Sequence, residues 1–211
     1  MLLSCAFVNL KPGVGKTTSA VWLAHALHEQ GCPPLLVDGD PAASALRWSD
    51  LAGGFPFPVV ALPVGDVHRR VDDLTTGRSA VVLDAPQLED HVRITRSIMR
   101  YAGDWIIPLM PAPIEVDRMA PLKGEMADVQ TLRNRPARSA VLLNRTNRDQ
   151  ATRTGPDADV RDVLAEQGYD VLTTQIPRLD LYSQSFGRPV NAADTAYMDL
   201  AGELIKRQEW V

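Results

Sequence analysis

The sequence predicts an α/β fold in which helices cover both faces of a mostly parallel, twisted sheet. Three observations predict it. Short apolar runs alternate with segments of helical periodicity along nearly the whole chain. A glycine-rich loop and a helical segment follow the first apolar run directly, which is the order of a strand–loop–helix unit. The 211 residues fit one domain, residues 1–211, and a domain of this size buries about 70% of its unfolded surface.

Seven apolar runs are expected to form the strands of this sheet. They lie at residues 2–8, 35–37, 59–62, 80–83, 105–109, 140–143 and 171–176. The first helix is predicted by the i, i+3, i+4, i+7 spacing of Ala20, Leu23, Ala24 and Leu27, and Gly31 marks its end. Further helices are expected at residues 42–51, 66–74, 91–101, 116–132, 157–167 and 193–206, and a polar loop at residues 145–156.

The loop Lys-Pro-Gly-Val-Gly-Lys-Thr-Thr at residues 11–18 predicts a phosphate-binding site. Its glycines let backbone N–H groups converge on phosphate oxygens, and the N-terminus of the next helix adds partial positive charge. Lys16 supplies a full charge, and the Thr17 hydroxyl suits Mg²⁺. A bare Gly-Lys-Thr also occurs at ordinary helix starts, but the strand before it and the helix after it favour nucleotide binding. The residues expected to bind are Gly13, Val14, Gly15, Lys16, Thr17 and Thr18.

Carboxylates end two further strands of the predicted sheet. Asp38 and Asp40 follow the second apolar run, and Asp84 follows the fourth. The carboxyl ends of parallel strands meet at one sheet edge, which is also where the phosphate loop falls. Carboxylate and hydroxyl oxygens are ligands that Mg²⁺ prefers. We therefore expect a metal site formed by Thr17, Asp40 and Asp84. Two acids with one residue between them also occur in solvated turns, and an acid after an apolar run is a common pattern, so these alternatives stay open.

A second lysine makes the loop unusual. Leu10 stands where the general phosphate loop has its first glycine, and Lys11 lies five residues before Lys16. This pattern resembles the deviant loop of the ParA/MinD family of P-loop ATPases. The resemblance implies a single-domain P-loop NTPase that uses ATP, ADP and Mg²⁺, and a Lys11 that crosses a dimer interface to the partner's nucleotide. Pro12 replaces a glycine of the family motif and removes one backbone N–H.

The segment Asp38-Gly39-Asp40-Pro41 resembles the Asp-x-Asp-Pro-Gln switch of the same family, with Ala42 in place of the glutamine. The resemblance implies catalytic roles for Lys11, Asp38 and Asp40. The proline-rich residues 108–113 are similar to those of small ParF-type partition ATPases, and residues 176–178 and 185–189 to the family's segment that flanks the adenine. On this basis Asn144 and Pro177 are expected to contact the base, although a satisfied turn amide equally explains Asn144.

The resemblance implies a slow ParA-like ATPase for plasmid partition. Such a protein forms a nucleotide-dependent homodimer and higher assemblies, and a centromere-binding ParB-like partner stimulates its Mg-dependent hydrolysis. Binding to non-specific DNA follows from the same resemblance. The net charge of −4 means that the chain as a whole is not attracted to DNA, so such binding needs a local basic patch.

Three alternatives remain from the sequence. A MinD-like positioning ATPase needs a membrane-binding tail, for which residues 197–211 offer few net basic charges. A relative of the nitrogenase iron protein needs bridging cysteines, which Cys5 and Cys32 do not suit. A conjugation accessory ATPase uses the same nucleotide chemistry. The chain has no apolar run of about 18 residues and no leader-like start, so we expect a cytoplasmic or nucleoid-associated protein without integral membrane contact.

Overall fold

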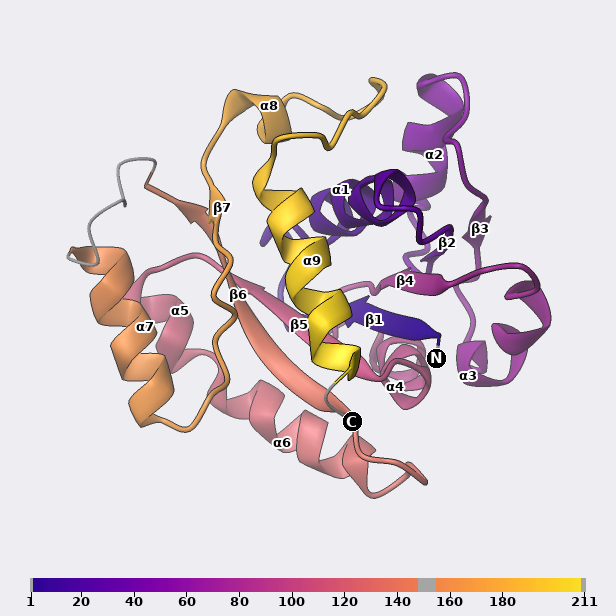
Figure 1. The fold of residues 1–211 in the computed structure, drawn as a ribbon. Helices are drawn as coiled ribbons and strands as arrows, with labels where there is room; N and C mark the ends of the chain where they lie inside the picture. Colours follow the sequence, from indigo (N-terminus) through magenta and orange to yellow (C-terminus); the bar gives the residue numbers. More distant parts are fainter. Residues whose placement is uncertain (1, 148–154, 210–211) are drawn as a thin grey trace.

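The computed structural model describes residues 2–147 and 155–209. Its centre is an all-parallel sheet with the strand order β3-β2-β4-β1-β5-β6-β7 (Figure 1). The strands are β1 Leu3–Phe7, β2 Pro34–Asp38, β3 Val59–Ala61, β4 Ala80–Asp84, β5 Asp104–Leu109, β6 Arg138–Thr146 and β7 Ile176–Pro177. This arrangement confirms the predicted α/β fold, because β1 lies inside the sheet between β4 and β5.

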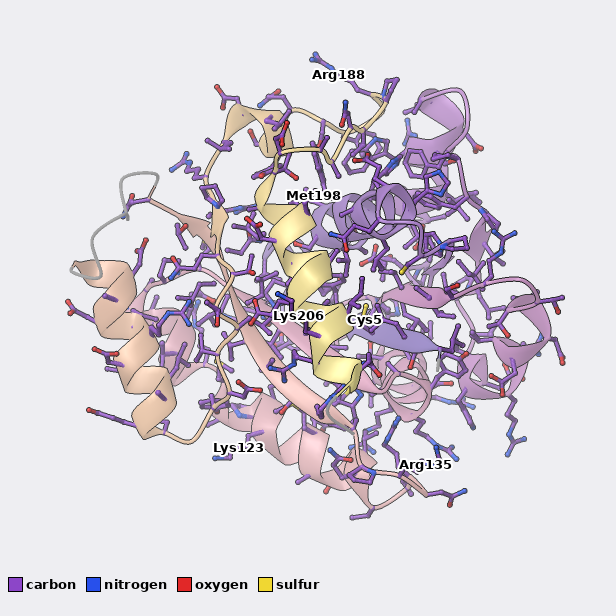
Figure 2. The ribbon with its side chains drawn as sticks, in the orientation of Figure 1. Cys5, Lys123, Arg135, Arg188, Met198 and Lys206 are labelled. Atoms are coloured by element: carbon purple, nitrogen blue, oxygen red, sulfur yellow. The ribbon has the colours of Figure 1, made fainter. Side chains whose placement is uncertain are left out.

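Helices cover both faces of the sheet. They are α1 Lys16–Glu29, α2 Ser44–Leu51, α3 Val67–Arg70, the 3₁₀ turn η1 Asp72–Leu74, α4 Val92–Tyr101, α5 Pro113–Asp117, α6 Ala120–Gln130, α7 Pro156–Glu166, α8 Asp180–Ser183 and α9 Ala196–Glu209. Side chains on successive residues of β1 enter opposite cores. Cys5 lies in the core under α1 and α9 (Figure 2). Ala6 lies in the core that α4 and α6 cover.

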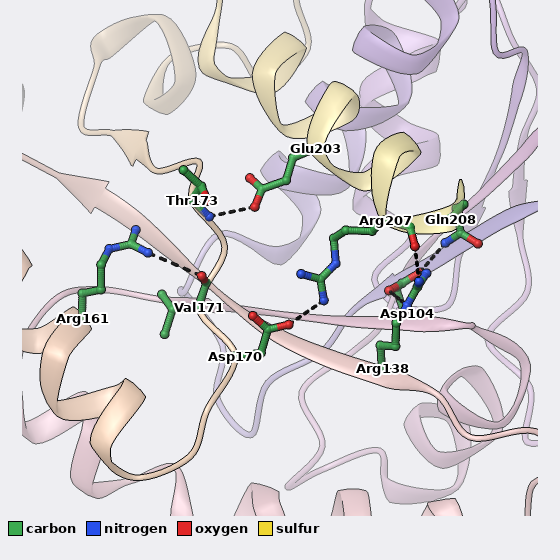
Figure 3. A network of polar contacts seen from close by, with 9 residues as sticks. All are labelled: Asp104, Arg138, Arg161, Asp170, Val171, Thr173, Glu203, Arg207 and Gln208. Carbon is green, nitrogen blue, oxygen red and sulfur yellow. Dashed lines mark hydrogen bonds and ion pairs between the residues drawn. The ribbon is translucent and has the colours of Figure 1, made fainter. Parts of the chain in front are cut away.

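The last expected strand is largely absent, so this part of the prediction was wrong. Val171 makes a single bridge to β6, and a regular strand returns only at Ile176–Pro177. Between them the N–H groups of Thr173 and Thr174 each donate to the Glu203 carboxylate of α9, at 2.8 Å. Figure 3 shows the bond from Thr173. The apolar run predicted a strand, but a side chain on a distant helix takes the hydrogen bonds that a sheet neighbour would otherwise receive.

Two expected helices are each divided. The segment at 116–132 forms α5 and α6 because Pro121 has no N–H to donate to the carbonyl of Asp117, the last residue of α5. The segment at 66–74 begins as α3 and tightens to η1, where Leu74 N–H donates to the Val71 carbonyl. The helix α8 was not predicted. Of the polar loop expected at 145–156, residues 148–154 lie outside the described residues.

Within residues 2–147 and 155–209, no helix is long and apolar enough to cross a membrane.

Candidate nucleotide-binding site

The phosphate loop joins β1 to α1 and depends on two glycines with positive φ. Gly13 has a φ of 77° and Gly15 a φ of 94°, in the left-handed region that side chains rarely adopt. A Cβ atom at Gly15 would also lie 2.5 Å from Nδ2 of Asn144. Any other residue at position 15 would therefore displace Asn144 or the loop. Lys16 starts the helix, so the loop glycines and the N-terminus of α1 are adjacent, as the sequence predicted.

Lys16 is buried at 7% exposure, and its ammonium donates a hydrogen bond to the carbonyl of Lys11 at 2.9 Å. Burial lowers the pKa of Lys16, while the nearby carboxylates of Asp84 and Asp40 act in the opposite direction. The ammonium is thus held over the loop by the loop's own backbone. Within the described residues the side chain of Lys11 makes no hydrogen bond or ion pair, whereas its N–H donates to Oδ1 of Asn9.

Asp84 ends β4 and is fully buried, and neither carboxylate oxygen has a hydrogen-bond partner in the part of the chain that the structure describes. Burial raises the pKa of this carboxyl to about 8, opposed by the nearby Thr17 hydroxyl and Lys16 ammonium. An unpartnered buried carboxylate is costly unless a ligand completes it. Asp84 is therefore poised to accept a cation or a water molecule bound to one.

Asp38 lies beside Asp84 in the parallel register of β2 and β4, yet both of its carboxylate oxygens accept hydrogen bonds. Oδ1 accepts the N–H of Asp40 at 3.1 Å, and Oδ2 accepts those of Ala45 and Leu46 at 2.8 and 3.0 Å. Asp38 therefore ties the Asp40 loop to the first turn of α2. This geometry gives it a positioning role that the sequence reasoning missed, and its expected catalytic role stays a prediction.

Asp40 differs from Asp38 because it is half-exposed and, among the residues described, its carboxylate bonds only within its own loop. Its Oδ1 accepts the N–H of Ala42 at 2.9 Å. The turn before it has no room for a side chain, since a Cβ atom at Gly39 would lie 2.5 Å from Cδ1 of Ile98. The loop thus presents a carboxylate at the same sheet edge as Asp84, and its Oδ2 makes no hydrogen bond within the described part of the chain.

A cleft of about 470 Å³ opens beside the loop. It is lined by Gly15 and Thr18 together with Asn144 and Pro177, so the residues expected at the phosphates and at the base border one cavity. The Asn144 amide donates to the Val14 carbonyl at 2.9 Å, and its oxygen accepts the N–H of Arg145. In this conformation Asn144 holds the loop, and its contact with a base stays a prediction.

Aromatic residues of the cleft wall were not predicted. Tyr182 and Tyr197 line it and pack against Trp22 of α1, with ring centroids 4.9 and 5.8 Å away. The Tyr197 hydroxyl also lies 3.1 Å from Oγ of Ser19. Because these contacts join residues more than 150 positions apart, no local pattern in the sequence signals them.

The donor set at this edge fits Mg²⁺ shared with phosphates. No group of three or more histidine, cysteine, aspartate or glutamate side chains that would hold a metal unaided occurs among the residues described. Asp84 has two buried oxygens without a partner among the described residues. Thr17 lies in the first turn of α1, and Asp40 lies in the loop between β2 and α2. Mg²⁺ is usually held by one or two protein groups plus waters and substrate phosphates, which is the set present here.

Comparison with known families agrees with this geometry. The model of the CobQ/CobB/MinD/ParA nucleotide binding domain matches residues 5–190, most of the chain. The chain belongs to this family. The loop with Lys11 and Lys16 therefore sits in a member of the ParA/MinD group of P-loop ATPases, as the resemblance implied.

Relatives of this ParA/MinD-family chain have different cargo or chemistry in their names. "Maintenance of carboxysome distribution protein A" of Gloeobacter kilaueensis is 36% identical over 116 residues, 53% of this chain and only 50% of that protein. "Protein ParA" of Rhizobium radiobacter is 24% identical over 179 residues, 83% of this chain and 78% of that protein. The chain also shares its fold with cobyrinic acid a,c-diamide synthase of Mycobacterium smegmatis bound to an ATP analog and magnesium. The TM-score is 0.77 at 22% identity, covering 99% of this chain and 96% of that one.

Proposed function

We propose that the chain is a ParA-like ATPase that partitions plasmid DNA by ATP-dependent dimerisation and Mg-dependent hydrolysis. The observation that carries the nucleotide chemistry is the buried, unpartnered carboxylate of Asp84 at the same sheet edge as Lys16. A group of this kind is stable in a functional site because its ligand supplies the missing partners. Family membership supports ATP with Mg²⁺ as that ligand, with the cation on the side of Asp84.

In this proposal each residue of the site has a separate role. Lys16 and the N–H groups of Gly13 to Lys16 bind the phosphates, and Thr17, Asp84 and Asp40 hold Mg²⁺, which neutralises phosphate charge when bound. Asp40 orients the attacking water or the metal's water shell. Asp38 keeps the Asp40 loop attached to α2 and so fixes where that carboxylate stands. Asn144 and Pro177 border the base in the adjoining cleft.

Lys11 is proposed to act in a second subunit's site. Its ammonium has no partner in the described chain, and the neighbouring Pro12 and Gly13 are exposed, so the loop is open to a facing molecule. A homodimer that forms around ATP would bring each Lys11 to the partner's phosphates. Light scattering with ATP against ADP tests this, because Lys11→Ala should reduce ATP-dependent association while leaving monomer binding intact.

The partners of the cycle are a centromere-binding ParB-like protein that stimulates hydrolysis, and non-specific DNA that the ATP dimer or a higher assembly binds. In this scheme the protein acts in the cytoplasm, on the nucleoid. A nucleotide switch of this type requires that the γ-phosphate is contacted differently in its two states. The Asp40 loop is the element placed to do so, because it joins the site to α2.

A protein cargo is the second candidate, favoured by the carboxysome-distribution relative at 36% identity. The MinD-like alternative is weaker, because Leu200, Ala201 and Leu204 of α9 are buried in the core with α1 and do not form a free apolar face. The nucleotide site would serve any of these cargoes equally. Cargo choice therefore depends on surfaces away from the phosphate loop.

Parallel measurement of phosphate release and retention on duplex DNA tests the proposal. Asp40→Ala should bind ATP, release phosphate slowly and stay on DNA longer than wild type, with binding that weakens steeply as salt rises. Asp50→Ala, an exposed carboxylate on α2, is the matched control and should behave as wild type. Normal phosphate release by Asp40→Ala would reassign the water-orienting role. Absence of ATP-dependent DNA retention in every protein would favour a protein cargo.

A further inference from the structure

Four residues on the outer surface combine exposed apolar groups with unpaired positive charge. They are Arg47 and Leu51 of α2, and Phe186 and Arg188 of the segment after α8, and we call them the α2 patch. Leu51 is 57% exposed and Phe186 50% exposed. Both arginines are exposed, and neither forms an ion pair in the part of the chain described. Figure 2 shows Arg188 at the rim of the molecule, directed away from the sheet.

The patch is built rather than accidental. Trp48 is buried beneath it, donates from Nε1 to the Arg188 carbonyl at 2.8 Å, and has its ring centroid 5.7 Å from that of Phe186. Gly187 has a φ of 75°, and a Cβ atom there would lie 3.2 Å from Cδ1 of Leu51. Segment 186–188 is therefore fixed against α2, and the exposure of Phe186 is not due to a free loop.

The positions of the charges define what fits the patch. Arg47 and Leu51 are spaced i, i+4 on α2 and share one face, while Phe186 and Arg188 flank the glycine that contacts Leu51. Two exposed apolar side chains and two exposed arginines thus stand on two adjoining segments, and Asp50 is the carboxylate of α2. Guanidinium groups bind carboxylates through paired hydrogen bonds, and arginine and aromatic side chains dominate binding energy at protein interfaces.

We infer that the α2 patch is a docking surface for an acidic segment of a partner protein that carries an aromatic or aliphatic anchor. Charge complementarity favours this occupant over DNA. The chain has a net charge of −4, and the two arginines of the patch alternate with apolar side chains instead of forming a row of basic groups that could follow a phosphate backbone. Four side chains cover less surface than a stable interface buries, so we expect a weak, transient contact.

The patch is mechanically joined to the nucleotide site. Its helix α2 is held at the opposite end by Asp38, which accepts the N–H groups of Ala45 and Leu46 and also that of Asp40. If the Asp40 loop moves with nucleotide state, α2 moves with it, and the spacing between Leu51 and Phe186 changes. This link rests on the proposed function, whereas the docking surface itself does not.

Fluorescence anisotropy with a labelled synthetic peptide tests the surface without nucleotide. The probe is a short peptide with one phenylalanine and one leucine among glutamates, compared with a counterpart that has lysine at each glutamate position. We expect the acidic peptide to bind with a Kd of order 10 µM. Arg47→Glu with Arg188→Glu, and separately Leu51→Ser with Phe186→Ser, should each weaken it about tenfold or more. Arg93→Glu with Leu132→Ser, exposed residues elsewhere, should not.

Several results would overturn the inference. They are no binding of the acidic peptide up to about 1 mM, equal binding of the basic counterpart, or binding that survives both double variants. Loss of duplex DNA binding in the arginine variant alone would assign the patch to nucleic acid. Loss of self-association in the Leu51→Ser, Phe186→Ser protein would assign it to a second copy. Equal peptide affinity with ATP and with ADP overturns only the link to the switch, provided that both nucleotides bind.

Discussion

Two buried aspartates, one at the carboxyl ends of the strands and one at the amino ends, differ in their hydrogen bonds. Asp84 ends β4 with no exposure and no hydrogen-bond partner in the described chain, whereas Asp104 begins β5 at 2% exposure with every carboxylate oxygen bonded. Arg138 donates to both oxygens of Asp104, at 2.8 and 2.7 Å, and Gln208 of α9 donates a third bond at 2.6 Å (Figure 3).

This difference indicates that Asp104 has a structural role and Asp84 a functional one. At the amino ends of the strands, Asp104 connects β5, β6 and the last turn of α9, where Arg138 also donates to the Arg207 carbonyl and Arg207 pairs with Asp170. Such a buried charge holds the fold together because its partners are part of the chain. At the carboxyl ends, the Asp84 carboxyl group has no hydrogen-bond partner within residues 2–147 and 155–209. Its stabilisation is therefore left to a ligand.

Asp104→Ala should produce the largest change in stability. The change removes two hydrogen bonds from Arg138 and one from Gln208 and leaves the Arg138 charge without its carboxylate, so the free energy of unfolding should fall by about 3 kcal/mol. Urea denaturation followed by circular dichroism measures this. Asp199→Ala, an exposed carboxylate on the same helix as Gln208, should change it by less than about 0.5 kcal/mol. Equal effects from the two variants would mean that the Asp104 network adds nothing to the fold.

Asp84→Asn should raise the free energy of unfolding, whereas Asp104→Ala should lower it. Because the pKa of Asp84 is raised to about 8, from an unfolded value near 3.8, the folded state keeps a proton that the unfolded state loses. The wild type should lose stability as pH rises from about 4 to about 8. The variant lacks this loss, so it should be more stable by about 2 kcal/mol at pH 8, with a difference that shrinks toward pH 4.

Mg²⁺ with ATP should remove that advantage by stabilising the wild type and much less the variant. Thermal unfolding at several pH values, with and without ATP and Mg²⁺, provides the measurement. A variant less stable than wild type at pH 8 without ligand would show that Asp84 is satisfied inside the fold after all.

Asp38→Ala should have the smallest effect of the three. It lies at the same edge as Asp84 but is partnered like Asp104, through the N–H groups of Asp40, Ala45 and Leu46. Loss of a helix-capping carboxylate costs about 1 kcal/mol, offset in part because burial of Asp38 also raises its pKa and disfavours its charge. Urea denaturation measures the change in the free energy of unfolding. A gain in stability would contradict the prediction and would mean that the Asp38 carboxylate, like that of Asp84, needs a ligand to stabilise it.

The sequence predicted the parts of this comparison that local patterns encode. The loop glycines, Lys16 and the strand-end aspartates occupy the sheet edge that their spacing indicated. It did not predict that the Asp38 carboxylate accepts N–H groups of α2, because this depends on where Ala45 and Leu46 lie in the folded chain. Nor did it predict the Glu203 bonds that replace the last strand, or the Trp22 cluster under the cleft, since both join segments far apart in the chain.

Calorimetric titration with ATP and Mg²⁺ tests most directly whether the carboxyl edge of the sheet is the ligand site. Wild type should bind. Lys16→Ala, which removes the full positive charge over the loop, should weaken binding by about a hundredfold or more. Lys206→Ala, an exposed lysine on α9, should bind as wild type does. Unchanged ATP affinity in Lys16→Ala would contradict the account, because it would place the nucleotide away from Lys16 and Asp84, the buried ionisable groups that define the site.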